Sequence, residues 1–464
     1  MESGEFKLKF NLTTKLYAQK KVLNKCVFCK KYKASKQGKR NNRIRFKCLN
    51  CGLWFVKGDK NSNQAEISLK QILLDHLDGV SFRNLVSRHG SNKNKLCEIT
   101  NNQISKFKDN FEITKQFLKQ LKYTGNLVVD GKCIPVKETI KSIGHVTGKI
   151  PRSSKRRRIK KAMVVIWGAD YSTHDMPHYE FGESENGFVF DNYFRKLKSI
   201  NYPLKSLTAD DRREIVLAAE RHYPDCVVQL CARHYITKVS RTLTISNIKI
   251  KINAKQNQID ELFVDDNSAY IPTTRFYSIK RAVKLSNEIA EMEFKYELLI
   301  DFQNIVDSII FAGDYRTARI RIASLEKYFW PKRFAMREYF PKEHIRIVKK
   351  LFSDFKDHKE YLLNYLKYPR LNIPRTTNLI EGYNSQLELR LASIKGFETF
   401  KTARNYINVW IIKRRFSKFS DCKNHFKKLN GKTPLECAGA DISNIRDWIK
   451  WCQNGESKSP PSKE

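Results

Sequence analysis

The chain has 464 residues with 88 Lys or Arg against 48 Asp or Glu, which gives a formal net charge of +40. Such an excess attracts polyphosphates and makes binding strongly salt-dependent, so nucleic acid is the expected partner. No apolar run approaches the roughly 20 residues that span a bilayer, and no secretory signal is visible. Membrane and secreted classes are therefore not expected, and the eleven cysteines are predicted to lie in a reducing compartment.

Four cysteines form two pairs near the N-terminus, Cys26 with Cys29 and Cys48 with Cys51. Two residues lie within each pair and eighteen between the pairs, a spacing that presents four thiolates tetrahedrally to one Zn²⁺. Chance and redox chemistry are the alternatives for a single pair, but two pairs favour zinc. Four sulfurs leave no open position on the metal, so we expect a structural zinc ribbon over residues 1–65.

Residues 66–124 are predicted to hold three short helices and a linker helix. The first ends at Asp78 and Gly79, the second ends at Gly90, and the third carries Lys93 and Lys95. Two short helices joined by a glycine turn, followed by a basic helix, are typical of a helix-turn-helix that reads DNA. Because that motif is degenerate, an ordinary helical linker is the alternative interpretation.

From residue 125 the pattern changes to apolar strands. The expected strands are NLVVDGKCIPVK, KKAMVVIWGA, HYEFG, LKSLTAD and CVVQLC, with one helix before the fourth and one before the fifth. The order β-β-β-α-β-α-β, followed by a helix, is that of a ribonuclease-H-like α/β core, which we expect over residues 125–240.

The rest of the chain is predicted to be mainly helical. Residues 241–370 lack strand alternation and are too many for a loop, so they are expected to form an all-α insertion. Residues 371–420 are expected to close the core, and GFETFKTARNYINVWIIKRRFSKF within them reads as a basic amphipathic helix. A C-terminal helical region with a disordered tail is expected over residues 421–464.

Three carboxylates fall where separate elements of such a core would meet. Asp130 lies on the first strand and Asp210 ends the fourth, and these two strands are parallel neighbours in a ribonuclease-H-like sheet. Glu381 opens a helix at the rim of an apolar stripe that would pack against the sheet. Three such carboxylates suit a site for two Mg²⁺ or Mn²⁺ ions.

Other acids compete for these places. Asp170 also ends a strand, but that strand should run antiparallel to the first and carry Asp170 to the opposite edge. Asp211 fits a helix N-cap or a first-turn acid. Asp265 and Asp266 lie in a polar stretch that reads as a solvated loop.

The segment TTNLIEGYNSQLELR resembles the closing motif of the Mutator-like DDE transposases, in which Thr-Thr-Asn precedes the catalytic Glu and an Asn follows it. Cys231 and His234 match that family's Cys-or-Asp, two residues, then His after the fifth strand. The resemblance covers about 125–240 and 370–415. The family usually has a small residue after its second Asp, so the presence of Asp211 leaves the choice between Asp210 and Asp211 open.

The resemblance implies an enzyme that cleaves and joins DNA strands, with two Mg²⁺ or Mn²⁺ ions held by Asp130, Asp210 and Glu381. It implies that His234 lies near the scissile phosphate and that Cys231 supports the turn. A buried core cysteine with a structural histidine is the alternative, and a zinc site would need two more ligands. Side chains expected to contact DNA are Arg375, Thr376, Thr377, Asn378 and Asn384, although Thr377 or Asn378 can also simply cap the helix.

A basic run lies between the first two expected strands and contains Arg156, Arg157 and Arg158. A hairpin tip that contacts DNA is the favoured interpretation. A nuclear localisation signal and a merely solvated face are the alternatives.

The expected partners are double-stranded DNA, as terminal inverted repeats and target, and further copies of the chain in a homodimer or larger homo-oligomer, because transposition holds two ends together. No membrane partner is expected. The location would be cytoplasmic and nucleoid-associated in a prokaryote, or nuclear in a eukaryote. Two other functions compete: a domesticated, non-catalytic zinc-ribbon and helix-turn-helix DNA-binding regulator, and a ribonuclease-H-like nuclease such as a resolvase.

Overall fold

The computed structural model describes residues 25–26, 34–40, 43–52, 54–56, 62–89, 92–140, 157–262, 272–329, 342–394 and 396–454. Cys29, Arg156, Asp265, Asp266 and the C-terminal tail lie outside the described residues, so the predictions made for them stay predictions. No described helix is both long enough and apolar enough to cross a membrane.

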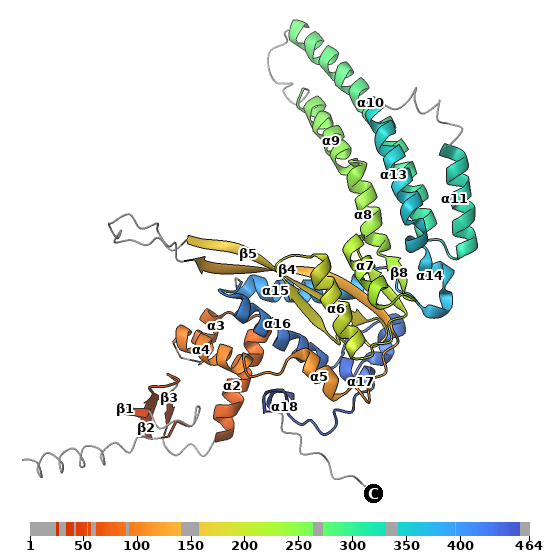
Figure 1. The fold of residues 1–464 in the computed structure, drawn as a ribbon. Coiled ribbons are helices and arrows are strands. Elements are labelled where there is room, and N and C mark those ends of the chain that lie inside the picture. The colour runs from red at the N-terminus through yellow and green to blue at the C-terminus, as the bar shows by residue number, and fades with distance from the viewer. Residues whose placement is uncertain are drawn as a thin grey trace, which may run out of the picture.

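The N-terminal part combines a small sheet with short helices (Figure 1). Its elements are β1 (Ala34–Arg40), β2 (Arg43–Cys48), β3 (Trp54–Val56), α2 (Ser62–Leu77), α3 (Phe82–His89), α4 (Lys93–Ile104) and α5 (Asn110–Gln116). The three strands are antiparallel neighbours, and Ile72, Leu85 and Leu96 form a buried cluster that joins α2, α3 and α4. The three short helices predicted here are therefore confirmed.

A five-stranded mixed sheet forms the centre of the molecule. Its strands are β4 (Asn126–Ile140), β5 (Arg157–Asp170), β6 (Tyr179–Gly182), β7 (Ser206–Ala209) and β8 (Val227–Leu230). They lie in the order β6-β5-β4-β7-β8; β6, β5 and β4 pair antiparallel, whereas β7 runs parallel to both β4 and β8. This arrangement confirms the predicted strand order and the parallel pairing of the first and fourth strands.

The outer halves of β4 and β5 continue past the sheet as a two-stranded ribbon (Figure 1). Arg157 pairs with Ile140 and Arg158 with Thr139, so this part of the basic run lies in the strand and not at a hairpin tip. The strand is longer than predicted because its polar extension is paired with β4 although it has no apolar alternation.

Helices cover both faces of the sheet and use opposite sets of strand residues. On one face, α6 (Gly187–Ser199) and α7 (Arg213–His222) pack on residues such as Leu127 and Val129. On the other face, α15 (Asn378–Ile394) and α16 (Phe400–Arg415) pack on residues such as Val128 and Trp167. Alternate residues of one strand therefore point to opposite helical layers.

The helix α16 is not amphipathic as predicted. Residues 406–412 are buried without interruption, so most of its circumference faces protein. The cationic residues in the last turn suggested a solvent-exposed face. Arg415, the last residue of the helix, is however completely buried.

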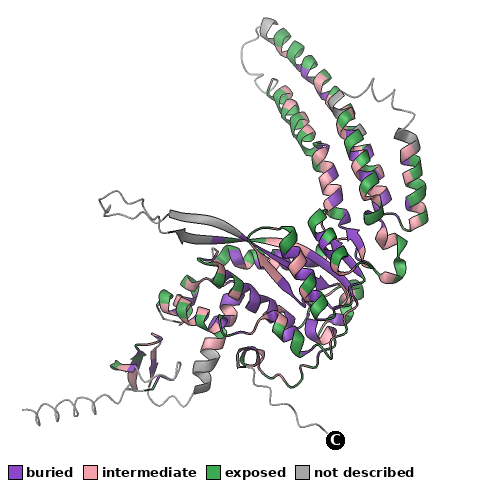
Figure 2. Cartoon of the chain, in the orientation of Figure 1, coloured by how far each residue is buried: buried purple, intermediate pink, exposed green. Residues whose placement is uncertain are grey.

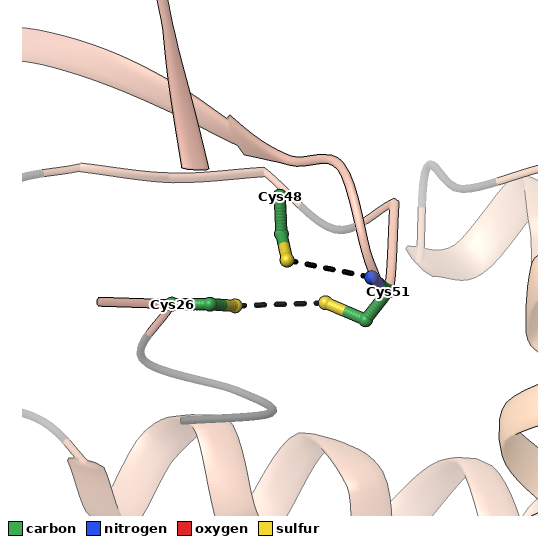
Figure 3. A group of neighbouring side chains, drawn as sticks. All are labelled: Cys26, Cys48 and Cys51. Atoms are coloured by element: carbon green, nitrogen blue, oxygen red, sulfur yellow. Dashed lines mark hydrogen bonds between the residues drawn. The ribbon is translucent and has the colours of Figure 1, made fainter. Parts of the chain in front are cut away.

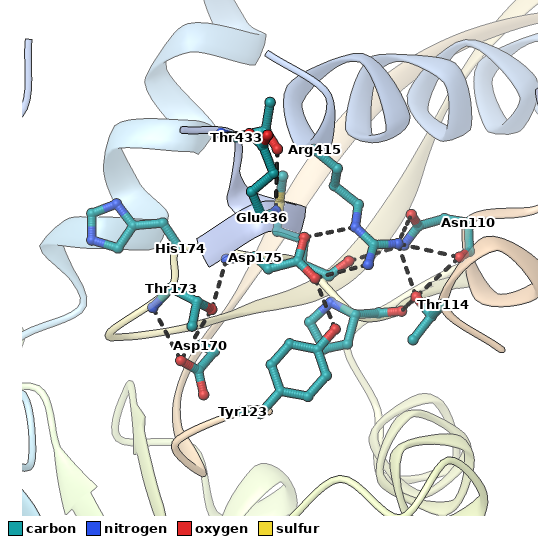
Figure 4. Close-up of polar contacts among 12 residues, drawn as sticks. Asn110, Thr114, Tyr123, Asp170, Thr173, His174, Asp175, Arg415, Thr433 and Glu436 are labelled. Atoms are coloured by element: carbon teal, nitrogen blue, oxygen red, sulfur yellow. Dashed lines mark hydrogen bonds and ion pairs between the residues drawn. The ribbon is translucent and has the colours of Figure 1, made fainter. Parts of the chain in front are cut away.

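A buried ion pair holds this end of α16 on the sheet layer (Figure 4). The Nε of Arg415 lies 2.7 Å from Oδ1 of Asp175, and its Nη2 donates to Oδ2 at 2.8 Å. The Nη1 donates to Asn110 Oδ1 and to Thr114 Oγ1, both at 2.8 Å, and Tyr123 donates its hydroxyl to Asp175 at 2.8 Å. Every charge in this cluster thus has a protein partner.

The predicted all-α insertion is helical throughout its described part. It follows α8 (Ala232–Thr242), the helix expected after the fifth strand, and its elements are α9 (Ile245–Glu261), α10 (Pro272–Ile310), α11 (Tyr315–Phe329), α13 (Lys342–Leu362), α14 (Asn364–Lys367) and the 3₁₀ turn η2 (Pro369–Leu371). These helices form an arm that projects from the sheet (Figure 1). Burial is concentrated in the sheet, its covering helices and the base of the arm, whereas the outer arm is largely exposed (Figure 2).

The C-terminal region folds back on the helices that precede the sheet. It contains η3 (Asn424–Leu429), α17 (Pro434–Cys437) and α18 (Trp448–Asn454). The backbone N–H of Lys108 donates to the Cys452 carbonyl at 3.0 Å, and the rings of Phe117 and Trp451 lie 5.5 Å apart.

Candidate active site

Asp130 and Asp210 are brought side by side by the parallel pairing of β4 with β7. Val128 pairs with Thr208 in this ladder, and each aspartate lies two residues further along its own chain. Both therefore point to the same face as Val128, which is the face covered by α15. Asp210 follows directly after the last residue of β7.

Glu381 reaches the same place from the first turn of α15. Its Oε1 accepts a hydrogen bond of 2.6 Å from the hydroxyl of Thr377, four residues earlier. The helix is fixed over the sheet by its buried face of Ile380, Tyr383 and Leu387, which holds the carboxylate at the edge of that layer.

His234 lies between two of these carboxylates. It belongs to the first turn of α8, and its Nδ1 is 2.5 Å from Oδ1 of Asp210, while its Nε2 is 3.8 Å from Oε1 of Glu381. The hydrogen bonds to Asp210 and Cys231 raise the pKa of His234 to about 10, against the opposing effect of burial. The imidazole is therefore protonated at neutral pH and offsets part of the negative charge.

Asp130 is the least compensated member of the group. Its Oδ1 accepts from the backbone N–H of Gly131 at 2.7 Å, and its Oδ2 accepts from Asn384 Nδ2 at 2.6 Å. Burial, and then the negative charge of Asp210, raise the pKa of Asp130 to about 7. Two carboxylates repel each other here with no Lys or Arg between them among the contacts described, which is the condition that a bound cation relieves.

Asp211, the rival of Asp210, points elsewhere. Its Oδ2 accepts from Lys238 Nζ at 2.7 Å, and its Oδ1 lies 3.1 Å from Nε2 of His358 on α13. Asp210 is therefore the residue that meets Asp130, Glu381 and His234.

Asp170, the other rival, is a completely buried structural acid. It accepts hydrogen bonds from the hydroxyl of Tyr202 at 2.9 Å and from the backbone N–H groups of Thr124 and Thr173 at 3.0 and 3.2 Å. It ends the antiparallel strand β5, as predicted, away from the three other carboxylates.

Two residues expected to contact DNA are buried within the protein. Asn384 uses its Nδ2 on Asp130, and its Oδ1 accepts from Trp167 Nε1 at 2.9 Å. Thr377 is completely buried, with its hydroxyl 2.6 Å from Glu381 Oε1 and 3.3 Å from His234 Nδ1. Both side chains are held by these internal hydrogen bonds to Asp130 and Glu381, and the DNA contact expected of them stays a prediction.

Cys231 is the N-cap residue of α8 and contacts Thr377 beside the candidate site. Its buried Sγ lies 3.2 Å from the Thr377 hydroxyl and 3.4 Å from the Thr377 N–H. Burial alone would raise the pKa of Cys231, but hydrogen bonds with His234 and Thr377 outweigh it and lower the pKa. Asp210, Cys231 and His234 offer ligand atoms within 4.8 Å of one another, and no fourth ligand joins them among the described residues, so the zinc interpretation stays incomplete.

The remaining expected DNA contacts are more open to solvent. Arg375 and Asn378 are exposed and Thr376 is half-buried, beside the N-terminus of α15, and the Arg375 guanidinium lies 5.1 Å from the ring centre of Phe311. In the N-terminal part, Lys93 is exposed. Lys95 is half-buried and donates to the Asn50 carbonyl at 2.8 Å, which ties α4 to the small sheet. Nothing is described for the side chains of Arg157 and Arg158.

A fourth carboxylate, Glu185, stands beside Asp130 and was not predicted. Its side chain pairs with Arg212 and packs directly against Gly131, where a Cβ would collide with it. Its negative charge also contributes to the raised pKa of Asp130. The residue lies in a loop before α6 with no strand-end or motif signal, so only the three-dimensional structure reveals it.

The small N-terminal sheet holds a separate cluster of sulfurs (Figure 3). Ligand atoms of Cys26, Cys48 and Cys51 lie within 4.8 Å of one another, and all three side chains are buried. The backbone N–H groups of Asn50 and Cys51 donate to Cys48 Sγ at 3.3 and 3.4 Å. Burial raises the pKa of Cys48, although these N–H groups act to lower it. Three of the four predicted zinc ligands therefore converge.

No protein-family model matches the sequence, and no curated protein matches it. Among solved structures, the Drosophila P element transposase strand transfer complex has a TM-score of 0.38 at 11% identity, over 75% of this chain and 91% of that chain. The Mos1 transposase paired-end complex with left transposon end has a TM-score of 0.16 at 16% identity, over 49% of this chain and 78% of that chain. Scores this low do not establish a shared fold, so the chemistry of the site has to carry the functional inference.

Proposed function

We propose that this chain is a DDE transposase of the Mutator-like type, which binds terminal inverted repeats and catalyses metal-dependent DNA cleavage and strand transfer. The observation that carries the proposal is the meeting of Asp130, Asp210 and Glu381 around His234. These residues come from β4, the end of β7, α15 and α8, so four separate elements supply one cluster. The sheet order and the parallel pairing of β4 with β7 support a ribonuclease-H-like core.

The donor set suits hard divalent cations. Carboxylate oxygens are the ligands that Mg²⁺ and Mn²⁺ prefer, and the repulsion between Asp130 and Asp210 favours a cation between them. Two such ions, held by Asp130, Asp210 and Glu381, would supply activation of water or a DNA 3′-OH and stabilisation of the leaving oxygen. The activated water or 3′-OH would itself attack phosphorus. No side chain of the site then has to form a covalent bond to the DNA, and the phosphoryl group passes directly from one oxygen to another.

The chain's own residues fix this geometry. Asn384 orients Asp130 and Thr377 orients Glu381, each through a hydrogen bond of 2.6 Å. His234 lies between Asp210 and Glu381 and would stand near a phosphate bound at the site. Arg375, Thr376 and Asn378 would bind the DNA backbone beside it, where the N-terminus of α15 also favours anions.

The N-terminal part would provide DNA recognition. Cys26, Cys29, Cys48 and Cys51 would hold one structural Zn²⁺, and α3 and α4 with Lys93 would act as a helix-turn-helix. Zinc analysis of the purified chain should give one Zn²⁺ per molecule and much less for Cys48→Ser. Retention of zinc in that variant would contradict the ribbon.

The deciding experiment is an assay of cleavage and joining on the inverted repeats that flank the gene, with Mg²⁺ or with a chelator. The wild type should cleave and join only with Mg²⁺, and Glu381→Gln should bind the same DNA without cleaving it. Equal activity of wild type and Glu381→Gln would contradict the proposal. Sequence-specific binding without any cleavage by the wild type would favour the regulator, and a preference for branched DNA would favour a resolvase-like nuclease.

A further inference from the structure

Residues 418–432, here called the lysine loop, follow α16 and contain η3. The loop carries five lysines and one acid, Asp421. The lysines are all exposed: Lys418, Lys423, Lys427, Lys428 and Lys432. The sequence predicts this segment only as part of a C-terminal helical region, and the candidate active site makes no use of it.

The lysine loop is closed on itself by hydrogen bonds. The N–H of Phe419 donates to the Lys432 carbonyl at 2.9 Å, and the N–H of Gly431 donates back to the Phe419 carbonyl at 2.8 Å. Asn430 spans the interior, accepting from the Cys422 N–H at 2.9 Å and donating to the Cys422 carbonyl at 3.1 Å. The backbone that carries the lysines is therefore held in one arrangement.

Aromatic contacts fix one side of the loop to the segment after β5. The ring of Phe426 lies 5.2 Å from Tyr171 and 4.4 Å from His174, and the ring of Phe419 lies 5.6 Å from His174. These rings occupy the inner side of the loop, which leaves the outer side to the lysines.

The charge on the outer side is not compensated within the described residues. None of the five amino groups lies within 4.0 Å of a described carboxylate, in contrast with lysines elsewhere such as Lys196, Lys238 and Lys413, which pair with acids. A polyanion that binds these cations does not have to order the backbone of the loop, so the entropic cost of binding is confined to the lysine side chains.

The loop is linked through Tyr171 and Asn126 to the segment that leads into the candidate active site. The N–H of Tyr171, which contacts the loop, donates to the Asn126 carbonyl at 2.7 Å, and Asn126 Nδ2 donates to the Leu371 carbonyl at 2.6 Å. From Leu371 the chain runs through Arg375 to Thr377 and Glu381. On the other side, the hydroxyl of Tyr383 on α15 donates to the His174 carbonyl at 3.1 Å.

We propose that the lysine loop binds the phosphate backbone of duplex DNA on one flank of the cleavage site, continuing the surface that begins at Arg375. This inference rests on the proposed function, because it assigns a partner to the same site. A lysine that contacts a phosphate acts as a point charge, and phosphate contacts carry no sequence information, so this binding is independent of sequence. An acidic protein is the competing occupant.

The test compares two full-length variants with equal net charge. The loop variant replaces Lys423, Lys427, Lys428 and Lys432 with Gln. The matched control replaces four lysines exposed on the α9–α10 arm, namely Lys249, Lys251, Lys280 and Lys284. Binding to a duplex of arbitrary sequence is measured across a salt series, because the slope of log K against log salt counts the phosphates neutralised.

The loop variant should lower the magnitude of that slope by about 0.9 for each phosphate that is no longer neutralised, so by up to about 3.6 for four lysines, whereas the control should stay close to the wild type. Lys427→Gln with Lys428→Gln is a milder second variant, expected to show about half that change. An unchanged slope in the loop variant, or equal changes in loop variant and control, would overturn the proposal. Thermal unfolding of each variant verifies that the substitutions leave the fold intact.

The result is distinguishable from the test of catalysis. Glu381→Gln should keep the wild-type salt slope while losing Mg²⁺-dependent cleavage. A wild type that never cleaves, together with a reduced slope in the loop variant, would contradict the transposase and support the DNA-binding loop. Full cleavage by the wild type with an unchanged slope in the loop variant would support the transposase and contradict the DNA-binding loop.

Discussion

Two clusters of charged side chains lie on the same helical layer of the sheet, and they differ in how their charge is neutralised. Around Arg415 and Asp175, both completely buried, each ionic group meets a protein partner. Around Asp130, Asp210 and Glu381, the imidazole of His234 is the only cationic group in contact among the residues that the structure describes, and the pKa of Asp130 rises to about 7. The first cluster stabilises the fold, whereas the second is held in a state that a bound cation would relieve.

The largest expected effect separates two adjacent aspartates. Asp210→Asn should reduce Mg²⁺-dependent cleavage on the order of 1,000-fold, because charge stabilisation at the reacting phosphate is lost. Asp211→Asn is the matched control and should lose less than about tenfold, since Asp211 pairs with Lys238 and His358 away from the site. Single-turnover cleavage rates measure both, and equal losses would contradict the assignment of Asp210.

The second prediction concerns the compensated cluster. Arg415→Met leaves Asp175 buried without a counter-charge and should lower the free energy of unfolding by about 3 to 5 kcal/mol. Adding Asp175→Asn should recover part of that loss, because no unpaired charge remains. Denaturant unfolding measures both variants. If Arg415→Met lowered the free energy of unfolding by less than about 1 kcal/mol, as expected for an exposed ion pair, water would have access to this cluster.

The third prediction tests whether Asn384 positions Asp130. Asn384→Ala should reduce cleavage about 10- to 100-fold, the usual cost of losing a residue that orients a metal ligand. Ser385→Ala is the control, because Ser385 is the next residue and is exposed. If Asn384→Ala cleaved like the control, the hydrogen bond to Asp130 would have no part in catalysis.

The smallest effect is a pH dependence of stability in the metal-free protein. The pKa of Asp130 is about 7 in the folded state and 3.8 as its ordinary value, so the folded state holds the proton more tightly. Folding is therefore opposed by this group as pH rises from about 4 to above 7, by at most about 4 kcal/mol and by less where water reaches the carboxylate.

Asp130→Asn removes this opposition. With a chelator present at pH 8, the free energy of unfolding of the variant should exceed that of the wild type by about 1 to 2 kcal/mol. At pH 4 the two proteins should have the same free energy of unfolding. An equal difference at both pH values would show that the carboxylate does not titrate in this range.

Much of the fold follows from local pattern. Apolar runs predicted the five strands and their order along the chain, and the parallel pairing of the first with the fourth, expected of a ribonuclease-H-like sheet, then placed Asp130 beside Asp210. The polar extension of β5 and the burial around α16 were missed, because neither has an apolar signature in the sequence.

The members of the candidate site were largely predictable, from strand positions for Asp130 and Asp210 and from the motif for Glu381, but the direction of other side chains was not. Asn384 and Thr377 are polar residues near a carboxylate, and the sequence does not show that packing turns them inward. Glu185 and the Arg415–Asp175 pair depend on contacts between distant parts of the chain, with 239 residues between the two partners of the pair. Such contacts arise from tertiary packing and leave no periodic signal.

The proposed chemistry requires Asp130, Asp210 and Glu381 to hold divalent metal together. A Mn²⁺ titration of the full-length chain with duplex DNA, followed by the electron paramagnetic resonance signal of free Mn²⁺, measures that binding without relying on cleavage. The wild type should bind Mn²⁺ at this site, and Asp210→Asn and Glu381→Gln should each bind fewer ions or bind them more weakly, while Asp211→Asn binds as the wild type. Identical Mn²⁺ binding by the wild type, Asp210→Asn and Glu381→Gln would contradict the assignment of these carboxylates as metal ligands.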